Sequence, residues 1–154
     1  MMSLSQLACL GCFLVALHLN IGICQKEECD DCCSNYKELN EPRRSIKSAW
    51  RKGHRAVCDR HLESGWYRFT SEVGGKMPER KVEEYNCGTH DPIWLNGRHP
   101  AVNGGHVVLK ACIHSFGIAC DESFDINVKN CGDFYVYYLK PTYYCATAYC
   151  AGKN

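Results

Sequence analysis

Alternation of apolar and polar residues predicts strands in much of this chain. Phe124, Ile126 and Val128 alternate with polar neighbours, which is the spacing of a half-buried strand. Other segments are rich in β-branched or aromatic residues and are bounded by turn residues, which also favours strands. The predicted strands are residues 65–69, 106–113, 124–129, 134–139 and 143–149.

A helical spacing occurs once, near the start of the cysteine-rich region. Ile46, Ala49 and Trp50 stand at positions i, i+3 and i+4, so they would form one apolar stripe. We therefore expect a helix within Tyr36 to Trp50, broken or begun at Pro42. The predicted fold is one compact, small, disulfide-rich domain that is mainly β, with a short N-terminal helix.

The first residues read as a secretory leader. The run from Leu7 to Leu19 is apolar and uncharged but too short for a confident membrane span. We place cleavage after Cys24; cleavage after Gly22, or an uncleaved anchor, are the alternatives. The expected divisions are a signal peptide at 1–24, an acidic cysteine-containing arm at 25–32, a domain at 33–150 and a tail at 151–154. The product is expected to be secreted, extracellular and without a membrane anchor.

Cysteine usage supports that location. The chain has 13 cysteines, three of them in the leader, and an even set of ten remains. So many thiols are rare in cytosolic proteins and typical of extracellular disulfide frameworks, whose pairing sequence alone does not give. A redox or zinc reading of the first three is weaker, because no histidine follows at finger-like spacing. The predicted disulfide cysteines are Cys29, Cys32, Cys33, Cys58, Cys87, Cys112, Cys120, Cys131, Cys145 and Cys150.

Charge and motifs argue against several functions. Eighteen Lys and Arg residues nearly balance 17 Asp and Glu residues, so no global field favours nucleic acid. The histidines are scattered and no nucleophile elbow or zinc-protease motif occurs, so we expect no enzyme, metal or cofactor. A small secreted hydrolase remains an alternative, because carboxylates are available whose separation the sequence does not give. These carboxylates are Glu63, Asp91, Asp121 and Glu122.

One local stretch is strongly basic. Arg43, Lys47, Arg51 and Arg55 would follow one side of the predicted helix and its continuation, which makes them a candidate anion-binding face for a lectin-like or anionic-glycan-binding protein. The simpler reading is a solvated face partly neutralised by the acidic arm. A group of aromatic residues could likewise be a sugar-stacking platform, although core packing is favoured. They are Trp66, Tyr67, Phe69, Trp94, Tyr135, Tyr137 and Tyr138.

Several segments in order resemble a known domain. They are Gly65 to Phe69, Met77 to Glu79, Cys87 to Pro100, Val128 to Cys131, Tyr135 to Tyr137 and Ala148 to Cys150. Together they are similar to the eight-cysteine domain of uromodulin, also found in the pancreatic zymogen-granule membrane glycoprotein and a related liver zona-pellucida-domain protein. The resemblance implies a non-enzymatic extracellular recognition module, with a role in innate defence at mucosal or body-fluid surfaces. We expect a monomer whose partner is an extracellular protein or glycan, microbial surfaces included.

Departures from that family pattern give further expectations. Lys81 and Ala119 stand where the family has cysteines, so we expect them to lie side by side, with Cys29 and Cys32 stapling the arm in compensation. Arg98 replaces the threonine of a family glycosylation sequon, so Asn96 is no acceptor, and no other N-glycosylation site is present. The family's glycan-decoy mechanism is therefore not expected to transfer.

Overall fold

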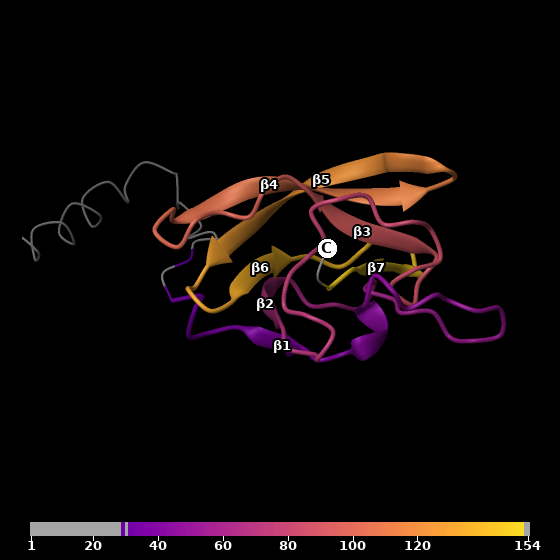
Figure 1. The fold of residues 1–154 in the computed structure, drawn as a ribbon, viewed down its shortest axis with the longest axis horizontal. Coiled ribbons are helices and arrows are strands. Elements are labelled where there is room, and N and C mark those ends of the chain that lie inside the picture. Colours follow the sequence, from indigo (N-terminus) through magenta and orange to yellow (C-terminus); the bar gives the residue numbers. More distant parts are fainter. Residues whose placement is uncertain (1–28, 30, 153–154) are drawn as a thin grey trace, which may run out of the picture.

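The computed structural model describes residue 29 and residues 31–152, which form seven strands and one 3-10 turn (Figure 1). The strands are β1 (Lys37–Leu39), β2 (Gly65–Phe69), β3 (Asp91–Asn96), β4 (His106–Ser115), β5 (Ile118–Asn130), β6 (Tyr135–Leu139) and β7 (Thr147–Tyr149). The 3-10 turn η1 spans Pro42–Arg44. No helix in this part of the chain is long and apolar enough to cross a membrane. The predicted leader at 1–24 lies outside the described residues.

The seven strands form one sheet in the order β1-β2-β6-β5-β4-β3-β7. The edge strands β1 and β7 each pair in parallel with a neighbour, and the other pairs are antiparallel. Chain segments beside the two edges meet, because Ser45 and Ala151 form a bridge. The Ile46 amide donates to the Ala151 carbonyl, and the Ala151 amide donates to the Arg44 carbonyl. Figure 1 shows the result, with β1 and β2 on the opposite side of the molecule from β4 and β5.

One apolar core lies inside this curled sheet. Strands far apart in the sheet order, β2 and β7, contribute to the same cluster, so the sheet wraps around it. The cluster includes Tyr67, Phe69, Ile93, Leu95, Ile126, Val128, Tyr137, Leu139 and Tyr149. On the other face of β2, Trp66 packs with Val136 and Tyr138 in a second cluster. Strand β2 is therefore buried on both faces, which explains why its aromatic residues do not alternate with polar ones.

The described strands confirm the predicted mainly β class. Strands β2, β4 and β6 occupy the segments predicted at 65–69, 106–113 and 134–139, and β5 contains 124–129. The strand predicted at 143–149 is present only over its last three residues, because Ala146 just before them takes a positive φ of 63°. Strand β3 escaped prediction because Pro92 to Leu95 are all buried, so they show no alternation.

The helix predicted within Tyr36 to Trp50 is wrong. Its first part is β1, which pairs in parallel with β2, and only Pro42–Arg44 make a helical turn. Further along, backbone groups bind distant segments: the Trp50 amide donates to the Tyr85 carbonyl. Each amide has one proton to donate, so these contacts replace helical hydrogen bonds. The spacing of Ile46 and Trp50 reflects two separate contacts, with a disulfide cluster and with the Tyr85 ring.

The ten cysteines from Cys29 to Cys150 form five disulfides. Cys29–Cys32 joins residues only three apart, so it does not fasten the arm to the domain as we expected. Cys33–Cys131 joins the residue directly after the arm to the end of β5. The remaining pairs are Cys58–Cys145, Cys87–Cys150 and Cys112–Cys120.

Of the two positions where the family has cysteines, one contacts Trp94 and the other adjoins a residue that packs with Trp94. The indole N–H of Trp94 donates to the Ala119 carbonyl at 2.9 Å. Val82, the neighbour of Lys81, packs in the same cluster as Trp94. This arrangement agrees with the expected proximity, while a direct contact between Lys81 and Ala119 stays a prediction.

A buried polar network holds the loop after β3 to the core. The His99 ring lies between two partners: Nδ1 is 2.5 Å from Glu79 Oε1, and Nε2 is 2.7 Å from the Tyr137 hydroxyl. The Tyr137 hydroxyl also accepts the Met77 amide at 3.0 Å, so its own proton goes to Nε2 of His99. Nδ1–H of His99 then donates to Glu79. The network therefore uses neutral histidine and ionised glutamate.

This network is expected to make the fold less stable in acid. Burial lowers the pKa of His99 below its ordinary 6.5, so below that pH the unfolded chain takes up a proton that the folded chain resists. Hydrogen bonds from the backbone and ring of His99 lower the pKa of Glu79 below its ordinary 4.5, which removes further stability as the pH falls past that value. Urea unfolding between neutral and acidic pH measures the decline. His99→Gln should flatten its upper part, and an unchanged profile in that variant would contradict the assignment.

Candidate functional site

The four basic residues predicted as an anion-binding face line one groove. Arg43, Lys47, Arg51 and Arg55 surround a hollow of about 410 Å³, together with Ser48, Ala49, Trp50, His54 and Gly88. All four basic side chains are exposed, and Trp50 is half-buried among them. The structure thus brings these residues together, although on an irregular segment rather than a helix.

Trp50 organises this groove. Its indole N–H donates to the His54 carbonyl at 2.8 Å, which closes the loop carrying Arg51. Its ring packs edge-on against His90, with centroids 4.1 Å apart, and also meets Tyr85. The loop is therefore closed at its base by a hydrogen bond and anchored to the segment that precedes β3.

Gly88 forms part of the groove floor. It has a positive φ of 63°, and a Cβ added there would lie 3.0 Å from the Arg43 carbonyl and 3.1 Å from Val57. The Gly88 amide donates to the Ser48 carbonyl, and the Val57 amide donates to the Gly88 carbonyl. Only glycine permits this close approach, which draws the two basic segments together across the floor.

The groove carries an excess of positive charge. Arg43 forms an ion pair with Glu41 and donates from Nη1 to the Arg55 carbonyl at 2.9 Å. Within residues 29 and 31–152, the side chains of Lys47, Arg51 and Arg55 lie within ion-pair distance of no carboxylate. Exposed cations gathered around one hollow attract anions and steer them toward it.

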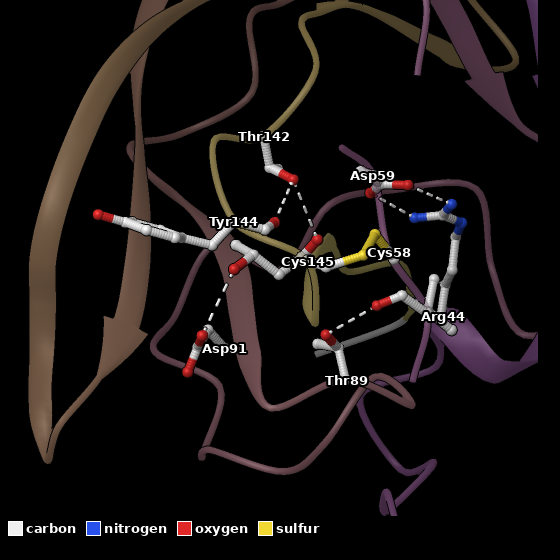
Figure 2. The surroundings of a disulfide bond; sticks show 10 residues. Arg44, Cys58, Asp59, Thr89, Asp91, Thr142, Tyr144 and Cys145 are labelled. Carbon is white, nitrogen blue, oxygen red and sulfur yellow. Dashed lines mark hydrogen bonds and ion pairs between the residues drawn. A yellow bond between two sulfur atoms is a disulfide. The ribbon is translucent and has the colours of Figure 1, made fainter. Parts of the chain in front are cut away.

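Arg44 belongs to the same basic stretch of sequence but has a structural role. Its guanidinium is buried and binds both oxygens of Asp59, from Nη1 at 2.7 Å and from Nη2 at 2.6 Å. Nη1 also donates to the Tyr149 carbonyl, and the Tyr149 amide donates to the Asp59 carboxylate. Figure 2 shows this pair beside the Cys58–Cys145 disulfide. Arg44 therefore links η1 to β7 and is not available to a ligand.

The carboxylates considered for glycosidase chemistry have different hydrogen-bond and ion-pair partners. Glu63 pairs with Lys37, Asp121 accepts a hydrogen bond from Ser115, and Asp91 accepts one from Thr147. Burial raises the pKa of Asp91, which packs at the start of β3. Among the described residues, no group of three or more His, Cys, Asp or Glu side chains could hold a metal ion.

The seven aromatic residues weighed as a sugar platform serve mainly in packing. Trp66, Tyr67, Phe69, Trp94, Tyr137 and Tyr138 are buried, and Tyr135 packs against the core. Among the residues that the structure describes, the exposed aromatic residues are others: Tyr85, Phe116, Tyr143 and Tyr144. The last two were assigned to a strand from sequence. In the sequence, Tyr143 and Tyr144 stand between Pro141 and Cys145, and that setting was the available signal for an exposed loop.

The position of the family sequon is exposed. Asn96 ends β3 and is open to solvent, and Arg98 two residues later is exposed as well. The site is therefore accessible, and the sequence lacks the hydroxyl residue that glycosylation at this asparagine needs.

Fold and cross-links together define a small, disulfide-rich β module of a single domain. The chain belongs to the uromodulin-like eight-cysteine domain family, whose model matches residues 67–151. It is 41% identical to the pancreatic secretory granule membrane major glycoprotein GP2 of Homo sapiens over 131 residues, which is 84% of this chain and 24% of that protein. It is 42% identical to uromodulin of Mus musculus over 127 residues, 82% of this chain and 19% of that protein. The chain thus spans a quarter or less of the length of these relatives.

Proposed function

We propose that this chain is a non-enzymatic extracellular recognition module that binds anionic glycans in the groove around Trp50. The observation that carries the proposal is the convergence of Arg43, Lys47, Arg51 and Arg55 on one hollow with a single paired carboxylate, Glu41. Sulfate, phosphate and carboxylate groups match such donors, since arginine presents several N–H groups in a fixed fork.

Family membership supports the extracellular and non-enzymatic parts of this proposal. The chain shares its domain with uromodulin and a secretory granule glycoprotein, and its ten paired cysteines suit an oxidising compartment. Since Asn96 lies in no sequon, we infer that the chain reads glycans rather than displaying one at this position. Acidic glycans of microbial or mucosal surfaces are the expected partners, which would place the protein in innate defence.

A glycan array is the test. The oxidised chain is expected to bind sulfated, phosphorylated or uronic-acid glycans, with affinity that falls as salt rises because the charges are exposed. Replacing the four groove cations by Gln should weaken binding at least about tenfold, equivalent to about 1.4 kcal/mol. The matched control removes four exposed cations elsewhere: Arg80, Lys81, Arg98 and Lys110.

The control separates a site from general charge attraction. If both variants lose binding equally, net charge and not the groove attracts the glycan. If the wild-type chain binds no acidic glycan, the proposed ligand class is wrong and a protein partner has to be sought instead.

A further inference from the structure

A second groove lies between the β4–β5 hairpin and the loop from β6 to β7. It has a volume of about 420 Å³; Ile113, Glu122 and Phe124 line the hairpin side, and Tyr143 and Tyr144 line the loop side. The two tyrosines are 81% and 56% exposed. Their rings stand at 80° to one another with centroids 4.7 Å apart. At this angle the face of one exposed ring is a flat apolar surface, and the other ring stands nearly perpendicular to it.

The hairpin side carries a free carboxylate above an apolar floor. Glu122 shares one face of β5 with Phe124 and Ile126, because alternate residues of a strand point the same way. Ile126 is buried in the core and Phe124 packs against it, whereas Glu122 lies beyond the core and is exposed. Among the described residues, Glu122 has no cation within ion-pair distance. Its oxygens are therefore available to accept hydrogen bonds from a ligand.

The loop side of this groove is held in place from behind. The Cys58–Cys145 disulfide fixes its end, and the Thr142 amide donates to the Asp59 carbonyl at 3.1 Å. The Thr142 hydroxyl donates to the Tyr144 carbonyl at 2.9 Å. Figure 2 shows the disulfide and the hydrogen bond from the Thr142 hydroxyl to the Tyr144 carbonyl, with the Tyr144 ring directed away from the disulfide. A loop fixed before binding loses little conformational entropy when a ligand arrives.

The charges of the lining select the ligand. Glu122 disfavours an anion in this groove. Asp125, also at the groove, is already paired with Lys110 at 2.7 Å. A neutral polyhydroxylated ring meets no repulsion, since its hydroxyls can donate to Glu122 and its C–H face can cover a tyrosine.

We propose that this groove is a binding site for a neutral sugar ring, which stacks on Tyr143 or Tyr144 and donates hydroxyl hydrogen bonds to Glu122. The site is distinct from the cationic groove around Trp50 in its residues and in the ligand it takes. A glycan chain with both kinds of unit could then place a neutral unit in this groove or an acidic unit in the cationic groove.

Nuclear magnetic resonance of the oxidised chain tests this site. The probes are methyl glycosides and short linear oligosaccharides of glucose, mannose, galactose and N-acetylglucosamine. At least one is expected to shift the ring signals of Tyr143 and Tyr144, with affinity independent of salt because the ligand is uncharged. Tyr143→Ala and Tyr144→Ala together should weaken binding about tenfold, while the double Phe variant keeps the stacking surface and most of the affinity.

A control and a second variant make the outcome decisive. Phe116→Ala removes an aromatic residue that is 91% exposed at the hairpin turn and does not line the groove, so it should leave binding unchanged. The variant with four Gln in the cationic groove should also bind neutral sugar normally, which separates this proposal from the first. Absence of ring shifts with every probe, or equal losses in the Phe116 and tyrosine variants, would overturn the assignment.

Discussion

Asp59→Asn is expected to lower the free energy of unfolding by about 3–5 kcal/mol, the cost of removing one partner from a buried ion pair. Asp59 is 2% exposed, and its carboxylate binds two guanidinium nitrogens of Arg44 (Figure 2). It also accepts the amide of Tyr149. An amide would leave the Arg44 charge without compensation inside the protein. It would also turn an N–H donor toward the guanidinium, which can only donate.

Chemical unfolding of the oxidised chain measures this effect. The matched control is Glu63→Gln, which breaks the exposed pair with Lys37 and should leave the transition unchanged because solvent screens that pair. Equal stability of the two variants would contradict the structural role given to the Arg44–Asp59 pair. The main-chain carbonyl of Asp59, which the substitution keeps, accepts the Thr142 amide from the loop that carries Tyr143 and Tyr144.

Removing the Cys87–Cys150 disulfide by a double alanine substitution is expected to cost about 4 kcal/mol. The chain-entropy estimate for a loop of this length gives that value, because the bridge joins residues 63 apart. Both sulfurs are fully buried in a cluster with Val82 and Trp94, so their loss also removes apolar contacts. The bridge links Cys87, the residue before Gly88, to Cys150, the residue after β7. Its removal should therefore loosen the cationic groove as well.

The Cys29–Cys32 disulfide provides the comparison. It closes a span of only three residues, for which the same relation gives less than about 2 kcal/mol. Urea unfolding of both double-alanine variants, with the other four bridges oxidised, gives the two values. If the short bridge stabilises the chain as much as the long one, loop closure is not what these disulfides contribute.

Alternation of apolar and polar residues predicted the strand at 124–129 within β5 but gave no signal for β3. The alternation along β5 reflects an apolar core face and a polar opposite face, on which Asp125 is exposed and Asn127 is buried. Strand β3 is buried over four consecutive residues, so it has no such signal. The false helix had the correct apolar spacing for Ile46 and Trp50, but partners elsewhere in the chain decide the conformation there.

The sequence predicted which basic residues form the candidate site, but not the contacts that bring them together. The basic residues 43, 47, 51 and 55 were chosen for helical spacing, yet they meet because Trp50 closes a loop and Gly88 allows a close approach. Arg43 and Arg44 are indistinguishable in sequence, and only the position of Asp59 makes one exposed and the other buried. The tyrosine groove forms between segments that come together only in the folded chain, so it had no local signature.

The most direct test of the cationic groove is a residue-by-residue binding map. The isotope-labelled, oxidised chain would be titrated with a sulfated oligosaccharide and followed by nuclear magnetic resonance. We expect the indole N–H of Trp50 and the amides of Arg51 and His54 to shift first, and raising the salt concentration to reverse the shifts. Shifts confined to other surfaces, or none at all, would contradict the claim that this groove is the recognition site.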